Sequence, residues 1–191
     1  MKKTSAQKKS TDKIILGIDP GTVIMGFGVL QISGRNMQLC EMGVIKLDKL
    51  NDPALKLKTI FEKTVELINK HLPDEFAVEA PFFGKNVQSM LKLGRAQGVA
   101  IAAALTHNIP IFEYSPKKIK MSITGNGNAS KEQVAAMLQN LLTIREMPKY
   151  LDATDGLAAA VCHHFQHNGL STEKKHSSWK SFLADNPGRK A

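Results

Sequence analysis

The amino-acid sequence predicts an α/β fold, built on a mixed five-stranded sheet with helices on both faces. Three apolar segments separated by turn residues open the chain, which indicates an antiparallel meander. Strand-like and helix-like segments then alternate, which is typical of strand–helix–strand units. The 191 residues suffice for one domain with a tail.

The first three strands are marked by apolar runs and by the turns between them. Residues 13–19 form an apolar run that ends at Pro20-Gly21. Residues 25–32 and 37–46 have the composition of two further strands, and a Ser-Gly-Arg-Asn turn joins them. We expect these three segments to pair as an antiparallel meander.

Helices and two more strands follow. Residues 53–71 start at Pro53, a favoured first helical position, and place apolar residues near helical spacing. The strands expected in the second half are 76–79 and 109–114. The remaining helices are expected at 86–107, at 130–143 with Ser130 as N-cap, and at 152–167.

The helix at 86–107 has an unusual second half. Residues 99–105 read VAIAAAL, which is apolar on every side. A helix of this kind is buried on more than one face, whereas one sheet covers one face only. We therefore expect a second partner, such as another subunit, to cover the other face.

Composition limits the class of protein. Hydrophobic residues make up 42% and charged residues 23%, as in ordinary globular domains. No apolar run approaches the ~18 residues of a membrane span, which excludes integral membrane proteins. Cys40 and Cys162 are too few for a disulfide framework, so a reduced, cytoplasmic compartment is expected.

The chain is expected to have one folded domain between two basic tails. Residues 1–13 are polar and lysine-rich, which predicts a disordered extension. The apolar run after them is too short for a targeting signal and ends at Asp19. The domain is placed at 14–170, and residues 171–191 are expected to form a flexible basic tail.

Positive charge is concentrated in the middle of the domain. The net charge is +9, and residues 81–131 contain seven basic residues but only one acidic residue. The flanking segments 14–80 and 132–170 are both net negative. This pattern favours a polyanion partner held near an acidic site, although a solvated basic surface would have the same composition.

Four acidic residues are candidates for that site. Asp19 and Glu79 each follow an apolar run at the end of a predicted central strand, and thus lie at the rim of the sheet. Asp152 and Asp155 are three residues apart and share one helix face. An aspartate before Pro-Gly also suits a turn, and Asp152 alone would suit a helix cap. The small residues that start at Gly156 favour a position for Asp155 towards the sheet.

Four carboxylates brought together would repel one another, and some would stay protonated without a counter-charge. Mg²⁺ or Mn²⁺ supplies that charge through oxygen ligands. Two such ions about 3.5–4 Å apart activate a water and stabilise the leaving oxygen of a phosphodiester. An acidic metal site beside a basic stretch therefore predicts a nuclease.

Other side chains give weaker signals. His163, His164 and His167 resemble a metal cluster, but they have no evident fourth ligand and are expected to be exposed on their helix. The Gly-Asn-Gly-Asn segment 125–128 is a loop that can approach a phosphate backbone. Phe82 and Phe83 suit either stacking on a base or filling space beneath their loop.

Several segments together resemble the RuvC family of Holliday junction resolvases, in matching order over nearly all of residues 14–167. They are ILGIDPGTVIMGFGVL (15–30), VEAPFFGKN (78–86), LKLGRAQGVAIAAA (91–104), FEYSPKKIKMSITGNGNASKEQV (112–134) and LDATDGLAAAVCH (151–163). The resemblance implies an RNase H-like fold and a homodimer in contact through the helix at 86–107. It also implies paired symmetric nicks at a four-way DNA junction in recombination and repair, and partner proteins that bind the junction and drive branch migration.

The resemblance also implies residue roles. The four acidic catalytic and metal-binding positions of the family fall on Asp19, Glu79, Asp152 and Asp155, and its base-stacking aromatic falls on Phe82.

Its two important lysines fall on Lys120 and Lys131, of which Lys131 is the better candidate to stabilise charge at the scissile phosphate or to aid proton transfer. Lys85, Lys117 and Lys118 in the basic stretch are further candidates for DNA binding. Ala80-Pro81 departs from the Gln-Val or Gln-Gln of many members, which leaves loop rigidity and sequence preference open.

Three other functions are compatible with parts of this pattern. An actin-like sugar kinase or ATPase also opens with a strand and Asp-x-Gly-Thr, but it needs two similar domains and a second phosphate loop. A non-catalytic DNA-binding relative would be expected to lack some of the four carboxylates. An RNase H-like nuclease acting on RNA or on an RNA–DNA hybrid is the third.

Overall fold

The computed structural model describes residues 12–34, 36–81 and 86–167. The sequence-based predictions for Phe82, Phe83 and Lys85 lie outside these residues. The predicted extension at 1–13, except its last two residues, and the predicted tail at 171–191 also lie outside them.

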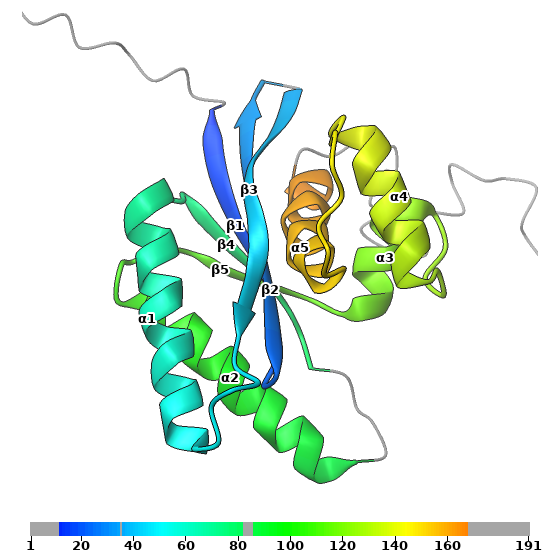
Figure 1. Ribbon diagram of the computed structural model, residues 1–191. Coiled ribbons are helices and arrows are strands. Elements are labelled where there is room, and N and C mark those ends of the chain that lie inside the picture. Colours follow the sequence, from blue (N-terminus) through cyan, green and yellow to red (C-terminus); the bar gives the residue numbers. More distant parts are fainter. Residues whose placement is uncertain (1–11, 35, 82–85, 168–191) are drawn as a thin grey trace, which may run out of the picture.

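The predicted mixed five-stranded sheet is confirmed, with strand order β3-β2-β1-β4-β5 (Figure 1). The first three strands pair antiparallel, and β1–β4 and β4–β5 pair parallel. The strands are β1 Lys13–Asp19, β2 Ile24–Ser33, β3 Asn36–Lys46, β4 Glu75–Glu79 and β5 Ile111–Tyr114.

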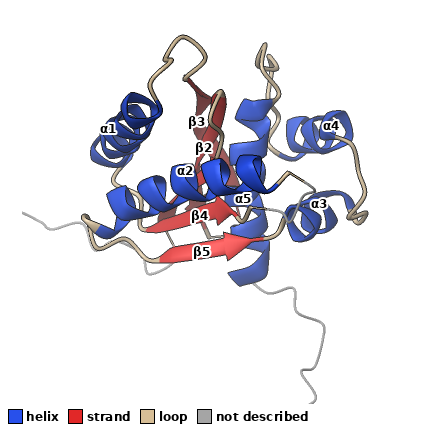
Figure 2. Cartoon of the chain, turned by 90° about the horizontal axis from the view of Figure 1, so that it is seen from below, coloured by secondary structure: helices blue, strands red, loops and turns tan. Residues whose placement is uncertain are grey.

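Helices cover both faces of the sheet, as predicted (Figures 1 and 2). The hydrophobic core on one face contains residues of α1 (Pro53–His71) and α2 (Val87–Leu105). On the other face the core contains residues of α3 (Pro116–Thr124), α4 (Lys131–Leu141) and α5 (Asp152–His167). No helix of the described residues combines the length and apolarity needed to cross a membrane.

Helix α3 is absent from the predicted elements, which place a strand at 109–114 and the next helix at 130–143. In the structure the Ser115 side chain caps the helix by accepting a hydrogen bond from the backbone N–H of Lys118, and Pro116 begins the helix. Serine at the N-cap followed by proline is a start signal that the sequence does contain.

Helix α5 lies unusually close to the sheet because glycines stand at the contact. A Cβ on Gly17 would lie 2.2 Å from the carbonyl oxygen of Gly156, and one on Gly28 would lie 2.4 Å from Cα of Leu157. Both distances are too short for any side chain. This close packing determines where the first turn of α5 meets the end of β1.

Candidate active site

The ends of two neighbouring strands bring Asp19 and Glu79 together. Parallel strands β1 and β4 pair Ile18 with Val78, and each strand ends one residue later at its acidic residue. Both carboxylates therefore lie at one edge of the sheet. This is the strand-end position that the apolar runs predicted.

The first turn of α5 adds Asp152 and Asp155 to this edge. Carboxylate oxygens of Asp19, Asp152 and Asp155 all lie within 4.8 Å of one another. Three carboxylates at this spacing form the all-oxygen donor set that a hard divalent cation prefers. The group of three draws on two elements more than 130 residues apart in the chain.

Glu79 lies beside this group of three rather than within it. Together with Asp19 it lines a pocket of about 160 Å³, whose other lining residues are Pro20, Ala80, Pro81 and Leu93. Its charge nevertheless reaches Asp19 and contributes to the raised pKa of that residue. Glu79 and Asp19 are thus close enough to act on the same bound group.

The carboxylates hold protons more strongly than ordinary acids do. Burial, followed by the charges of Glu79 and Asp155, raises the pKa of Asp19 to about 8. Burial and the charge of Asp155 raise the pKa of Glu79 to about 7. Burial also raises the pKa of Asp155, although Lys131 opposes the rise. The site therefore favours the binding of positive charge.

Lys131 supplies one positive charge from the start of α4. Its Nζ lies 2.5 Å from an Asp155 oxygen and 3.3 Å from an Asp152 oxygen. Burial alone would lower the pKa of Lys131, but the two aspartates raise it overall. The Ser130 N-cap and its reciprocal bond with Gln133, a capping box, hold this first turn of α4 in place.

The other predicted lysines are placed differently. The charge of Lys120, on α3, acts to lower the pKa values of Glu79 and Asp155, which puts Lys120 within electrostatic reach of the site. Lys117 is exposed, and its side chain lies against the backbone of Gly127. The Nζ of Lys118 lies 5.4 Å from the centre of the Tyr114 ring.

The expectation of exposed histidines is wrong for His163 and His164, which are 0% and 5% exposed. They are buried because α5 is enclosed between the sheet and helices α3 and α4. His167, on the last turn of α5, is exposed as expected.

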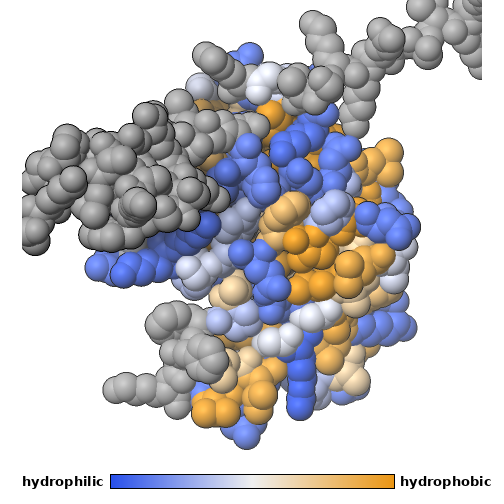
Figure 3. All heavy atoms as spheres, turned by 180° about the vertical axis from the view of Figure 1, so that it is seen from behind, coloured by the Kyte–Doolittle hydropathy of each residue, from blue (hydrophilic) through white to orange (hydrophobic). Residues whose placement is uncertain are grey.

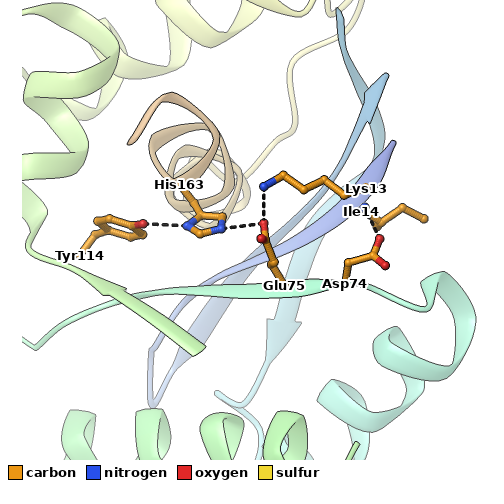
Figure 4. A network of polar contacts seen from close by, with 6 residues as sticks. All are labelled: Lys13, Ile14, Asp74, Glu75, Tyr114 and His163. Carbon is orange, nitrogen blue, oxygen red and sulfur yellow. Dashed lines mark hydrogen bonds and ion pairs between the residues drawn. The ribbon is translucent and has the colours of Figure 1, made fainter. Parts of the chain in front are cut away.

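His163 is the centre of a buried polar network (Figure 4). Its Nδ1 lies 2.7 Å from the Tyr114 hydroxyl, and its Nε2 lies 2.8 Å from Glu75, which pairs with Lys13 at 2.6 Å. Burial lowers the pKa of His163 to about 4, against the influence of Glu75. The network connects α5 to strands β1, β4 and β5. Both ring nitrogens of His163 are engaged by protein partners, which does not fit a role as a metal ligand.

Comparison with known proteins identifies the family. The model of a family described as crossover junction endodeoxyribonuclease RuvC matches residues 15–163, most of the chain. The chain belongs to the RuvC family. This membership confirms the resemblance seen in the sequence motifs and agrees with an RNase H-like α/β fold.

Relatives in the family are similar over almost their full length. The RuvC of Christiangramia forsetii is 60% identical over 177 residues, which cover 93% of this chain and 92% of that protein. The RuvC of Bacteroides fragilis is 61% identical over 180 residues, with 93% and 96% coverage.

A solved structure of T. thermophilus RuvC in complex with Holliday junction substrate is 30% identical, with a TM-score of 0.75. The match covers 81% of this chain and 94% of the T. thermophilus chain.

Proposed function

We propose that this chain is a metal-dependent endonuclease that resolves four-way DNA junctions by paired symmetric nicks during recombination and repair. The observation that carries the proposal is the convergence of Asp19, Asp152 and Asp155, with Glu79 beside them, at one edge of the sheet. Family membership supports the same activity, since the relatives are crossover junction endodeoxyribonucleases by name.

The four carboxylates are proposed to hold two Mg²⁺ ions, for which Mn²⁺ would substitute. Asp19, Asp152 and Asp155 would hold one ion, and Asp19 with Glu79 would hold the other. When bound, the ions would supply the counter-charge, an activated water and stabilisation of the leaving oxygen. The pKa of Asp19, raised to about 8, lies above that of Glu79, raised to about 7, so the Asp19 carboxylate gains most from a bound cation.

Lysines are proposed to bind the phosphates. Lys131 would move from its aspartate partners to the scissile phosphate once cations neutralise those aspartates, and would stabilise charge or aid proton transfer there. Lys120 would contact a neighbouring phosphate. Lys85, Lys117 and Lys118 are proposed to add weaker backbone contacts, and Phe82 is proposed to stack on an unpaired base.

A homodimer is proposed to form through the helix at 86–107. In the single chain α2 leaves Leu91 50% and Leu105 57% exposed, and Ala102 is exposed between them. The rear view in Figure 3 shows hydrophobic residues grouped on one face, as expected where a second subunit binds. A dimer would present two active sites to two strands of the junction.

We propose the domain limits, the location and the partner proteins that the sequence predicts. The nuclease domain is proposed to span 14–170, with basic tails at 1–13 and 171–191. A cytoplasmic location is proposed, together with partner proteins that bind the junction and drive branch migration.

The test is incubation of the full chain with a synthetic four-way junction, a linear duplex and an RNA–DNA hybrid, each without metal, with Mg²⁺ and with Mn²⁺. We expect symmetric nicks in the junction only, and only with Mg²⁺ or Mn²⁺. Cleavage of the hybrid in preference to the junction would instead assign an RNase H-type activity. An intact junction in the presence of both metals would overturn the proposal.

A further inference from the structure

A second basic group, separate from Lys120 and Lys131, lies at the end of β3. The Nζ of Lys46 donates a hydrogen bond to the Tyr150 hydroxyl at 3.1 Å and lies 4.5 Å from the centre of that ring. The Nζ of Lys149 lies 6.0 Å from the same ring centre. Lys46, Lys149 and Tyr150 are called the Tyr150 cluster below.

The strand register places this cluster beside the catalytic carboxylates. Asp19 at the end of β1 pairs with Gly26, and Ile24, two residues earlier in β2, pairs with Lys46 at the end of β3. Lys46 and Asp19 therefore lie at the same end of the sheet, where β1 and β3 both finish. Tyr150 stands two residues before Asp152, and its carbonyl oxygen accepts a hydrogen bond from the backbone N–H of Ala153 at 3.2 Å.

The cluster lies on the opposite flank of the site from Lys120. Strand β3 is one edge of the sheet, β5 is the other, and β1 with Asp19 is the central strand. Lys120 belongs to α3, which directly follows β5, and β3 and α3 lie well apart in Figure 2. Positive charge thus flanks the carboxylates on both sides.

The charges of the cluster are available to a ligand. Lys46 and Lys149 are exposed, and neither forms an ion pair with a carboxylate of the described residues, whereas Lys58 pairs with Glu62 on α1. The acidic charge that reaches Tyr150 is that of Asp48.

The Tyr150 hydroxyl accepts its hydrogen bond from Lys46, which leaves its own proton free to be donated. Two ammonium groups and a hydroxyl donor are the groups that proteins use to bind DNA phosphates.

We propose that the Tyr150 cluster binds backbone phosphates of the DNA strand on the β3 side of the scissile phosphate. The strand would then be held on both sides of the cleavage point, by the cluster on one side and by Lys120 on the other. This inference rests on the proposed function, since it names a further contact of the same nuclease with its DNA.

The first experiment measures junction binding in an Asp19→Asn background, where the DNA stays uncut. Lys46→Ala, Lys149→Ala and their double variant are titrated at several salt concentrations, with Lys58→Ala as a matched control on α1. If a cluster lysine contacts a phosphate, its replacement by alanine should reduce the magnitude of the slope of log K against log salt by about 0.9. Lys58→Ala should leave the slope unchanged, and Lys46→Arg should restore it.

The second experiment locates the phosphate. Junctions with a single neutral methylphosphonate are compared, and one position on the β3 side should weaken binding by the Asp19→Asn protein. The same substitution should have no further effect on the Lys46→Ala protein, because the contact is already lost. Tyr150→Phe should also weaken binding without a change in slope, because a neutral donor releases no counterion.

Two outcomes would overturn the inference. Slopes equal to that of Lys58→Ala would show that the cluster makes no phosphate contact. Lys46→Ala in a protein that retains Asp19 could instead lower the cleavage rate while the salt slopes of binding stay unchanged. That result would show that Lys46 only positions the first turn of α5. Failure of the proposed function looks different, because the unaltered chain would then leave the junction uncut.

Discussion

The backbone of Asp152 rests directly on Gly26. A Cβ on Gly26 would lie 1.8 Å from the Asp152 carbonyl oxygen, which no side chain tolerates. Gly26 is also the β2 residue that pairs with Asp19. One glycine therefore sets how closely the first turn of α5 approaches the carboxylate at the end of β1, and with it the spacing of the proposed metal ligands.

Gly26→Ala should accordingly damage both stability and activity. The added methyl group forces α5 away from β2, at a cost of about 1–3 kcal/mol in the free energy of unfolding. Junction cleavage should fall, and the Mg²⁺ concentration needed for half-maximal rate should rise. Urea unfolding and Mg²⁺ titration of the cleavage rate measure the two effects.

Gly43→Ala is the matched control for this variant. A Cβ there meets the end of the Phe27 ring at 2.8 Å, which is a side chain and can move. We expect a smaller loss of stability and an unchanged Mg²⁺ requirement. If Gly26→Ala also kept the normal Mg²⁺ requirement, the spacing argument would be wrong.

Asp19→Asn should abolish cleavage and preserve or strengthen junction binding. The amide weakens cation binding, and loss of a Lewis-acid contribution of several kcal/mol corresponds to about 10³-fold or more in rate. The same change removes a negative charge that repels phosphate. Single-turnover cleavage and a binding titration in EDTA measure these effects, and cleavage at the normal rate would argue against a metal mechanism.

Metal-free stability should fall as pH rises from about 6.5 to 8. The folded-state pKa values of Asp19 and Glu79 are about 8 and about 7, above their ordinary values of 3.8 and 4.5. In this range the folded chain binds more protons than the unfolded chain, so the free energy of unfolding decreases with pH. Mg²⁺ should reverse the loss, because it binds the ionised carboxylates of the folded state.

Thermal unfolding with and without Mg²⁺ at several pH values tests this behaviour. Asp19→Asn should be more stable than the unaltered chain at pH 8 without metal, by about 1–3 kcal/mol, because it removes a buried and repelled charge. It should also gain less stability from Mg²⁺. A metal-free protein that becomes more stable between pH 6.5 and 8 would contradict the raised pKa values.

Most of the fold was predictable because its signals are local. The apolar run of β1 before Pro20-Gly21, and Pro53 at the start of α1, each mark an element within a few residues. The position of Asp19 beside Glu79 was predictable for a related reason, since neighbouring parallel strands end at one edge. Helix α3, which is not among the predicted elements, also has local start signals in Ser115 and Pro116.

The rest depended on partners distant in sequence. Tyr114 and Glu75 lie 49 and 88 residues from His163, and without them a buried imidazole cannot be told from an exposed one. Lys46 and Tyr150 are 104 residues apart. The capping and ligand interpretations of Asp152 were equally compatible with the sequence until its contact with Gly26 placed it at the end of β1.

Lys131→Ala should slow cleavage by about 10²-fold and weaken binding less. The Lys131 ammonium group pairs with Asp152 and Asp155 and so lies where charge would develop on the scissile phosphate. Lys120→Ala should act mainly on binding and reduce the salt slope by about 0.9. Rates under saturating protein, together with binding at several salt concentrations, separate the two roles. A Lys131→Ala defect that disappears at saturating protein would assign Lys131 to binding alone.

Replacement of His163 should change how the free energy of unfolding depends on pH in the acidic range. The folded-state pKa of His163, about 4, lies below the ordinary value of 6.5. Between these two pH values the imidazole is protonated in the unfolded chain and neutral in the folded chain. The contribution of His163 to the free energy of unfolding therefore falls as pH drops through this range. Burial would raise the pKa of Glu75, but the hydrogen bonds and charges of Lys13 and His163 lower it overall. Protonation of Glu75 therefore removes further stability at still lower pH.

His163→Gln should be less stable at pH 7 by about 1–3 kcal/mol, because Tyr114 and Glu75 lose their shared partner. This stability difference between His163→Gln and the unaltered chain should shrink as pH drops from 6.5 to 4, because the variant lacks the imidazole that must be protonated on unfolding. Urea unfolding of both proteins across this range measures both effects, with His107→Gln, just beyond the end of α2, as the control. A stability difference that stays constant over this range would show that the His163 imidazole does not contribute to the acid sensitivity.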